Sequence, residues 1–343
     1  MEFKYYDVDQ TGRNVNFLRQ ATSNISLPKL VLSALTVGRP NVNAVLAHGR
    51  YSVMECMWRS AMVLSNVSIN RGANGLQHYS ASQAFKQLDP SEKGAVTFFI
   101  GGVFTKIVAE SFGIPTLYHL DTVHHYHRFI GPNLPTVSMR AGGNSRPDFI
   151  GPYAPNIFGV FESKGRSQSS DDPLRMSAKE QTRRINQINQ NDPFCRIGCI
   201  TSFGGRILTV DVVDPADSRE DAINIETKGA DFKEPYRITD GFIKATDRKS
   251  VTHVDTTYIV GKLEEADLEF GVSRDLLDVI ERGSNEDMEL EVFKRGLHKE
   301  VKFPESISDR INTDDNTQVA TALDGHYVKL GKSWEAIMTS YTA

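Results

Sequence analysis

Apolar residues recur at helical spacing through the first quarter of the chain. The segments LPKLVLSALTVG (27–38) and VLAHGRYSVMECMWRSAMVLSNVS (45–68) carry this spacing and contain few signals typical of strands. We therefore expect residues 1–88 to form a mainly helical N-terminal region. Trp58, inside the second segment, and Trp334 near the other end of the chain are predicted to be core residues rather than platforms for stacking bases.

A long apolar helix is marked next, with clear signals at both ends. Asp89-Pro90-Ser91-Glu92 supplies an N-cap residue, a proline at the first helical position and a capping-box glutamate. Gly113 is expected to end the helix. The interior is apolar on most sides, so the helix should be buried against something large. Gly101 and Gly102 lower its helix propensity and would let it lie close to a sheet.

Beyond this helix the pattern changes to short apolar runs bounded by turn residues, as in strands. The runs are IPTLYHL (114–120), RPDFIG (146–151) and NIFGVFESKG (156–165), then FCRIGCITSF (194–203) and RILTVDVV (206–213), the last two separated by a turn at Gly204-Gly205. Between the third and fourth runs, Leu174–Gln190 has helical spacing. This order predicts an α/β core over residues 89–214.

The last third of the chain, residues 215–343, is predicted to be a mixed C-terminal region of unclear role. It begins acidic and rich in turn residues, contains a predicted helix near 266–282 and a polar stretch at 306–317.

Composition limits the class of protein without identifying it. A chain of 343 residues suggests two domains, or one large domain with attachments. The hydrophobic content of 39% and charged content of 24% are ordinary for a globular protein. The net charge of −4 argues against a general nucleic-acid coat protein, so contact with nucleic acid would need a local basic patch.

Cysteine count and apolar segment length bear on the compartment. Three cysteines argue against a disulfide framework and for a reducing compartment, with Cys195 and Cys199 expected as buried thiols. No secretory signal is visible at the start of the sequence. The most apolar long segment, Gly94–Thr105, has 12 residues, whereas a membrane-spanning helix needs about 20. We expect a cytoplasmic protein without membrane contact.

Charged residues follow the third apolar run directly. Glu162 and Lys164 are two residues apart, so in a strand they share one face, while Ser163 points to the other. Asp148 precedes Glu162 by 14 positions, at the start of the previous run, and a chain reversal through GPYAPN (151–156) would bring the two carboxylates together. Adjacent carboxylates repel unless a cation lies between them, and Mg²⁺ prefers oxygen ligands.

This arrangement resembles the PD-(D/E)xK phosphodiesterase superfamily, which includes restriction endonucleases. The resemblance rests on Pro147-Asp148 and Glu162-Ser163-Lys164, together with the order of helix, strands and helix. It implies a restriction-endonuclease-like core, a mixed central sheet flanked by helices. It also implies Mg²⁺, with Mn²⁺ able to substitute, held by Asp148, Glu162 and the Ser163 carbonyl, and Lys164 as the catalytic lysine. A glutamate on the first core helix often adds a ligand; Glu110 and Glu92 both qualify by residue type, although capping already explains Glu92.

The acid-x-lysine triplet is not specific by itself. Five other triplets fit it: Glu2-Phe3-Lys4, Glu226-Thr227-Lys228, Asp231-Phe232-Lys233, Asp247-Arg248-Lys249 and Glu300-Val301-Lys302. Only Glu162 follows a long apolar run, has a Pro-Asp one run earlier and precedes an amphipathic helix. Glu226, with Asp214 upstream, is the nearest rival, and a purely structural ion pair at Glu162 and Lys164 is the other alternative.

The helix that follows the motif carries one polar residue on its apolar face. Leu174, Ala178, Gln181, Ile185 and Ile188 fall on that face, with Lys179 one step off it and not expected to reach the interior. A buried glutamine needs hydrogen-bond partners. Gln181 is predicted either to bond the backbone of the sheet or, as the resemblance suggests, to act at the catalytic site.

Two further groups of residues are candidates for contact with the substrate. Residues 140–190 hold eight basic and five acidic side chains, and Arg166, Arg175, Arg183 and Arg184 are candidates for phosphate contacts, solvated surface charge being the alternative for each. His119, His124, His125 and His127 invite a zinc interpretation, but their spacing is poor, and a loop close to the active site that touches substrate or phosphates is the favoured interpretation.

Together these observations predict a Mg²⁺-dependent endonuclease that hydrolyses DNA by metal-activated water, in restriction or in prokaryotic anti-phage defence. Its partners would be DNA and either a second copy of the chain or a larger defence complex. Two alternatives stay open: a non-catalytic interaction or assembly protein that keeps the fold, and an RNase on the same fold.

Overall fold

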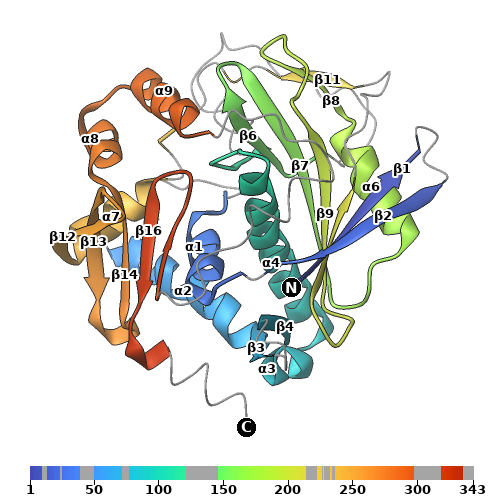
Figure 1. Ribbon diagram of the computed structural model, residues 1–343, viewed down its shortest axis with the longest axis horizontal. Helices are drawn as coiled ribbons and strands as arrows, with labels where there is room; N and C mark the ends of the chain where they lie inside the picture. The colour runs from blue at the N-terminus through green and yellow to red at the C-terminus, as the bar shows by residue number, and fades with distance from the viewer. Residues whose placement is uncertain are drawn as a thin grey trace.

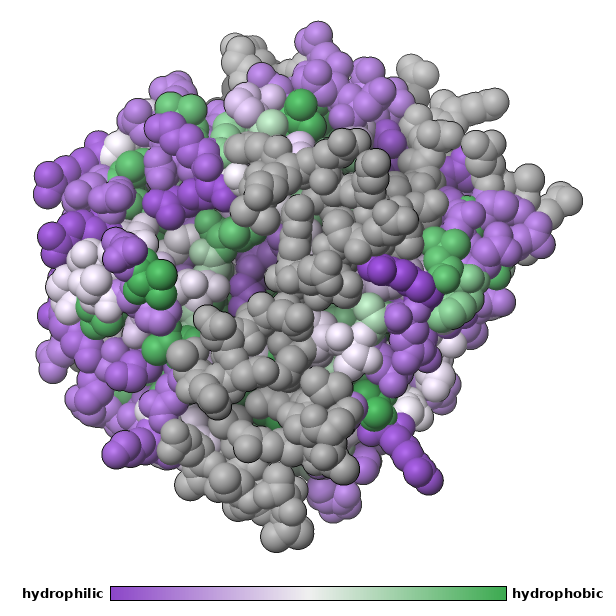
Figure 2. Space-filling view, viewed as in Figure 1, coloured by the Kyte–Doolittle hydropathy of each residue, from purple (hydrophilic) through white to green (hydrophobic). Residues whose placement is uncertain are grey.

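The protein is a mixed α/β molecule with two main sheets (Figure 1). The computed structural model describes residues 1–9, 14–23, 25–38, 50–71, 77–120, 146–213, 222–225, 227, 232–233, 236–296 and 318–334. On the face shown in Figure 2, the surface over the C-terminal sheet is mostly hydrophilic, with apolar residues scattered singly.

The larger sheet has seven strands in the order β2-β1-β10-β9-β7-β6-β5. Their bounds are β1 Glu2–Val8, β2 Val15–Thr22, β5 Tyr118–His119, β6 Phe149–Ala154, β7 Ile157–Arg166, β9 Arg196–Ser202 and β10 Thr209–Val213. β7 pairs with β9, and β1 with β10, in parallel, whereas the other neighbours are antiparallel. The prediction of a mixed central sheet flanked by helices is therefore confirmed at this level.

Helix α4, Pro90–Ser111, covers one face of this sheet. It starts as the sequence predicts: the Asp89 carboxylate accepts from the backbone of Ser91 and Glu92, and the Glu92 side chain completes a capping box. Gly113, with φ of 81°, follows its C-terminal end. By length and composition alone α4 is the one described helix that would suffice to cross a membrane, but 78% of its most apolar window is buried inside the molecule.

Glycine contacts let α4 lie directly on β7, as the sequence suggests for Gly101. A Cβ atom added to Gly101 would lie 3.0 Å from Ser163 Oγ and 3.1 Å from Gly165 N. A Cβ atom added to Gly165 would lie 1.8 Å from the carbonyl oxygen of Thr97 on the helix. The absence of side chains on both surfaces therefore sets the distance between helix and sheet.

Helix α6, Asp172–Thr182, covers the opposite face. Gly198 of β9 lies beside Glu162 in the sheet, and a Cβ atom on Gly198 would lie 2.9 Å from Ala178 Cβ on α6. The predicted helix 174–190 is wrong after Thr182, because Ile185–Ile188 forms strand β8, paired with β11, Ile223–Ile225. The sequence INQINQ at 185–190 contains β-branched and amide residues of modest helix propensity, which pairing with β11 outweighs.

The N-terminal region is more mixed than the sequence predicts. It contains the expected helices α1, Leu27–Thr36, and α2, Arg50–Asn66, together with α3, Gln83–Gln87. Four strands accompany them: β1 and β2, which extend the large sheet, and the hairpin of β3, Val67–Arg71, and β4, Gln77–Ala81. The expectation of a mainly helical region is wrong for these strands, whose short and partly polar segments carry little apolar pattern.

The C-terminal region forms a five-stranded sheet in the order β12-β13-β14-β16-β15. The elements are α7 Arg237–Ala245, β12 Asp247–His253, β13 Thr256–Leu263, β14 Leu268–Ser273, α8 Arg274–Arg282, α9 Asn285–Arg295, β15 Val319–Thr321 and β16 His326–Leu330. The predicted helix near 266–282 is confirmed only from residue 274, since 268–273 is strand β14. The polar stretch 306–317 lies outside the described residues.

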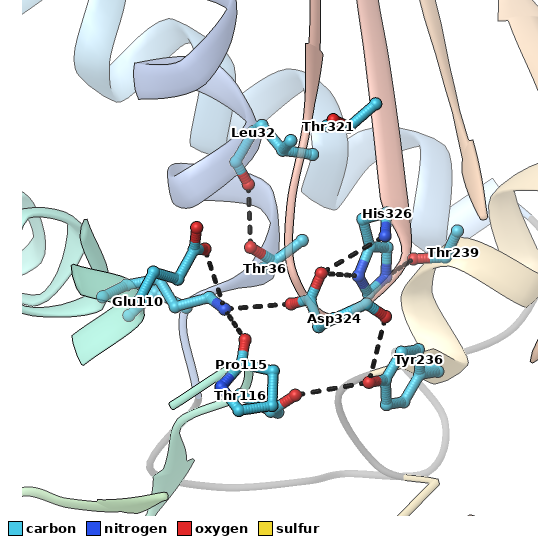
Figure 3. Close-up of polar contacts among 12 residues, drawn as sticks. Leu32, Thr36, Glu110, Pro115, Thr116, Tyr236, Thr239, Thr321, Asp324 and His326 are labelled. Carbon is cyan, nitrogen blue, oxygen red and sulfur yellow. Dashed lines mark hydrogen bonds and ion pairs between the residues drawn. The ribbon is translucent and has the colours of Figure 1, made fainter. Parts of the chain in front are cut away.

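A buried ion pair joins the two sheet regions (Figure 3). Lys106 of α4, which is fully buried, lies 3.0 Å from Asp324 Oδ2 in the turn before β16. The other oxygen of Asp324 lies 2.9 Å from His326 Nδ1, and His326 Nε2 lies 2.8 Å from Thr239 Oγ1 on α7. This chain of contacts fastens the C-terminal sheet to the long helix of the core.

The glycine contact between α4 and β7 gives a stability prediction with an internal control. Gly165→Ala is expected to lower the free energy of unfolding by at least ~2 kcal/mol, because the new methyl group would overlap a backbone carbonyl that cannot rotate away. Gly94→Ala, in the exposed first turns of the same helix with nothing near its added Cβ, is expected to raise stability by up to ~1 kcal/mol. Urea unfolding of both variants measures the difference; equal effects would contradict the tight contact.

Candidate active site

The two predicted carboxylates lie side by side, Glu162 on β7 and Asp148 directly before the first residue of β6. Antiparallel pairing of Phe149 with Phe161 puts Asp148 opposite Glu162 in the same register. The backbone N–H of Ser163 donates a hydrogen bond to Asp148 Oδ2 at 3.0 Å. Directly opposed residues have Cβ atoms about 5 Å apart. The chain reversal between β6 and β7 therefore does bring Asp148 and Glu162 side by side, as the sequence predicts.

Glu162 and Lys164 share the face of β7 that α6 covers. Lys164 Nζ lies 2.5 Å from Glu162 Oε1, and the side chains are 24% and 2% exposed respectively. Ser163 and Phe161 point to the other face, toward α4, as the contact with Gly101 shows. The site thus combines a buried carboxylate with a lysine that reaches the solvent.

Burial raises the pKa of both carboxyl groups, and the charge of Asp148 adds to the shift at Glu162. Desolvation is the main cause of the raised pKa of Asp148, and the Ser163 N–H and the Lys164 and Arg146 charges oppose it. Desolvation, together with the charge of Asp148, raises the pKa of Glu162 to about 8, although Lys164 counteracts both. A single ammonium group therefore does not compensate for the desolvation of the buried Glu162 and the half-buried Asp148.

The donor atoms fit a hard divalent cation. Among the described residues Glu162 Oε2 is buried and has no hydrogen-bond partner. The N–H and C=O of one residue point to the same side of a strand, so the Ser163 carbonyl faces the same gap before β6 as its N–H. No group of three or more His, Cys, Asp or Glu side chains is found in the described part of the chain. Two carboxylates and a carbonyl suit Mg²⁺, which keeps several waters.

Glu110, the third predicted metal ligand, lies elsewhere. It forms ion pairs with Lys29 of α1 and with Lys106, the latter at 3.1 Å, beside the Asp324 turn (Figure 3). Gly101 is the residue of α4 that contacts Ser163, and nine further residues of helix amount to roughly 13 Å along its axis. The structure therefore does not bring Glu110 together with Asp148 and Glu162. Glu92 is held in the capping box.

Gln181 lies on the covering helix, one turn beyond Ala178. Its Oε1 is buried and accepts no hydrogen bond from any described residue, so the oxygen does not bond the backbone of the sheet there. The expectation for Lys179 is wrong: this lysine is 5% exposed, and its Nζ donates to the carbonyl of Val8 at the end of β1. Lys179 is thus internal but belongs to the β1 side of the sheet.

The four predicted phosphate-binding arginines have different surroundings. Arg175 is held by Asp172 and the buried Asp211, and its guanidinium lies 4.0 Å from the centre of the Tyr6 ring. Arg183 forms an ion pair with Glu180 at 2.8 Å. Arg184 is half-buried, whereas Arg166 is exposed at the end of β7, two residues beyond Lys164. Arg166 is therefore the best placed of the four.

The structure also distinguishes the other acid-x-lysine triplets from the one at Glu162, and it shows a further charged residue beside Asp148. Glu2 lies opposite Thr22 and Thr209, and Asp247 opposite Lys262, so neither described rival faces a second acid. Glu226, Asp231 and Glu300 lie outside the described residues, as do His124, His125 and His127. His119 is buried with its ring against Phe149. Sequence reasoning missed Arg146, whose guanidinium interacts with Asp148; its position two residues before that aspartate was the available signal.

Comparison with known proteins adds no relative. No family model, no curated protein and no solved structure matches this chain.

The raised pKa of Glu162 gives a pH-dependent prediction. The folded protein keeps the Glu162 proton up to about pH 8, whereas the unfolded chain loses it near 4.5, so wild-type stability falls as pH rises across this window. Glu162→Gln stays neutral and escapes this loss. The variant should therefore gain stability over wild type from pH 5 to pH 8.5, by at most ~1.4 kcal/mol per pH unit.

Urea unfolding at pH 5, 7 and 8.5 in the presence of EDTA measures this gain. Glu264→Gln is a matched control, because Glu264 also pairs at 2.5 Å with a lysine two residues away but is 69% exposed. Its effect on stability is expected to be small, because an exposed pair contributes little. A gain for Glu162→Gln that is equal at all three pH values would contradict the buried, protonated carboxyl group.

Proposed function

We propose that this protein is a Mg²⁺-dependent endonuclease of the PD-(D/E)xK type that hydrolyses DNA phosphodiester bonds. The observation that carries the proposal is the cross-strand position of Asp148 opposite Glu162, with Lys164 paired to Glu162 on the same face. Neighbouring acidic side chains that are shielded from water destabilise a fold unless a positive charge compensates for them, so such a pair indicates a site that binds a charged ligand. A metal ion is such a ligand.

The order of elements supports the same proposal. Helix α4 precedes the antiparallel strands β5, β6 and β7, helix α6 follows, and β9 then lies parallel to β7. This order of helix, three strands, helix and parallel strand is what the resemblance to a restriction-endonuclease-like core implies. The two helices lie on opposite faces, so the strand that carries the triplet is enclosed between them.

The chain's own residues would divide the reaction as follows. Asp148, Glu162 and the Ser163 carbonyl would hold Mg²⁺, which when bound supplies an activated water and neutralises charge on the phosphate. Lys164 would orient the attacking water or stabilise the charge that develops on the phosphate oxygens. Gln181 on α6, with its buried amide oxygen, would help to position the side chains or water at the site. Arg166 would contact a flanking phosphate.

The proposed setting is restriction or prokaryotic anti-phage defence in the cytoplasm. A net charge of −4 leaves DNA contact to the local surface around Lys164 and Arg166. A second copy of the chain or a larger complex would supply the rest of the DNA-binding surface.

One observation favours a second candidate function. Glu162 and Lys164 already lie in direct contact, and a non-catalytic assembly protein retaining this fold would contain such a structural pair. An RNase on the same fold shares every site residue and differs only in its substrate.

Cleavage of supercoiled plasmid DNA with Mg²⁺ or Mn²⁺ tests the proposal. We expect Asp148→Ala, Glu162→Ala and Lys164→Met each to reduce cleavage by at least ~100-fold, because each removes a charge from the reacting centre. Glu264→Ala and Lys262→Met break the exposed pair on the other sheet and should cleave as wild type does.

A parallel assay with labelled single-stranded RNA distinguishes the RNase. Cleavage that survives both Glu162→Ala and Lys164→Met would refute the proposed site. Absence of metal-dependent cleavage of DNA and RNA by the wild-type protein would favour the assembly protein.

A further inference from the structure

A cavity of about 450 Å³ lies between α2 and α4, beside the strand that carries the proposed catalytic residues. Its walls are mainly apolar and aromatic, and they include Trp58, Met62, Phe98, Phe99, Phe149 and Ser163. The Trp58 and Phe99 rings lie 5.2 Å apart at a tilt of 57°. This volume is within the range of pockets that take small organic ligands, and the walls offer flat rings for stacking.

Helix α2 exposes several large apolar side chains, of which Trp58 lines the cavity. Its large apolar side chains Tyr51, Met54, Met57 and Trp58 are between 46% and 66% exposed, whereas the inward face combines the apolar Cys56 and Val63 with Ser52, Arg59 and Ser60. A helix that serves only to fill a core does not also expose four large apolar side chains. The prediction that Trp58 is a core residue is therefore wrong, and the outward apolar face marks a binding surface.

Ser163 gives the cavity one polar group that lacks a partner. Its side chain is 5% exposed, it lines the cavity, and its Oγ has no hydrogen-bond partner within the described parts of the chain. A buried hydroxyl without a partner costs free energy, so the occupant of the cavity is expected to carry a donor or acceptor.

Ser163 also connects the cavity with the proposed metal site. It stands between Glu162 and Lys164, whose side chains lie on the opposite face of the sheet. Strand β6 begins only at Phe149, so β7 beyond Glu162 has no described strand beside it on that side. Ser163, which lines the cavity, is the direct neighbour of Glu162, so the cavity and the proposed metal site meet at one residue of β7.

We propose that the cavity between α2 and α4 takes an unpaired nucleobase of the strand whose phosphate lies at Asp148 and Glu162. This inference rests on the proposed nuclease function and specifies its substrate as a strand with unpaired or extruded bases. Trp58 and Phe98 would stack on the base. Stacking of this kind accepts any of the four bases, because each base has a flat aromatic face. The Ser163 hydroxyl would bond the edge of the base.

Fluorescence of Trp58 provides a direct test. The chain has two tryptophans, so Trp334→Phe leaves Trp58 as the single reporter. With Ca²⁺ in place of Mg²⁺ to prevent cleavage, a single-stranded DNA octamer should change the Trp58 emission. Two control ligands are an abasic octamer with the same phosphates and a blunt duplex of the same sequence. Each should bind with an apparent affinity at least tenfold lower than that of the single-stranded octamer.

Three variants in the Trp334→Phe background sharpen the test. Phe98→Ala and Ser163→Ala should each weaken binding of the octamer by about tenfold or more, as expected for the loss of one base contact. Phe17→Ala is the matched control, because Phe17 is 56% exposed on β2 and Phe98 is 52% exposed; its affinity should equal that of the parent. Circular dichroism confirms that each variant is folded.

Several outcomes would overturn the inference. Equal binding of the abasic octamer would assign the signal to phosphates, and no change in Trp58 emission at millimolar octamer would exclude a base in the cavity. A wild-type dimer in sedimentation that Met54→Lys dissociates, with no response to DNA, would assign the α2 face to a second copy. If the protein cleaves plasmid DNA but no base binds in the cavity, only this inference is refuted. If base binding depends on Phe98 but the wild-type protein cleaves no nucleic acid, only the proposed nuclease function is refuted.

Discussion

The contact between α4 and β7 sets the position of every group at the candidate site. The helix lies on the strand at Gly101 and Gly165, where neither surface carries a side chain, and the Thr97 carbonyl occupies the space a β-carbon would need. A similar contact, Ala178 over Gly198, holds α6 on the opposite face. Strand β7 is thus fixed from both sides, and its alternation assigns Ser163 to the α4 cavity and Glu162 with Lys164 to the α6 side. A larger residue at either contact would separate these groups.

That enclosure also explains the electrostatics of the site. The helices that hold β7 in place exclude water from Glu162, and the antiparallel register adds Asp148 beside it. Desolvation and repulsion therefore act together on one carboxyl group, while Lys164 remains partly in solvent and offsets only part of the cost. A bound divalent cation would reverse the sign of the local field, so occupancy by metal and loss of the Glu162 proton are coupled.

Local signals in the sequence were sufficient for much of this region and insufficient elsewhere. The capping box at Asp89 and Glu92, the run ending in Glu162 and the reversal before it are short-range features, and the structure confirms each of them. Partners distant in sequence were not visible: β1 joins the sheet through pairing with β10, two hundred residues later, and Glu110 is drawn to Lys29 and Lys106. Glu110 was a candidate ligand because it is a glutamate on the right helix. Its contacts depend on its position along α4, which the sequence alone does not relate to the strands.

Helix α2 and strand β8 show two other limits of pattern reading. Helical spacing identified α2, but an apolar stripe says nothing about whether it faces the core or the solvent, and here the buried side is held by Arg59, which donates to the carbonyls of Ala34 and Val37. Ile185 and Ile188 fit both a helix face and a short strand, and pairing with β11 decided between them.

The Lys106–Asp324 pair bears on how the chain could be divided. A fragment that stops near residue 214 contains Asp148, Glu162, Lys164 and both covering helices, yet it leaves the buried Lys106 ammonium with Glu110 and without Asp324. Helix α1 would also lose the apolar partners Phe270, Val328 and Leu330 on the second sheet. Removing residues 215–343 would therefore take from the core one of the two acidic partners of Lys106 and the apolar cover of α1, so we expect such a fragment to be less stable than the whole chain.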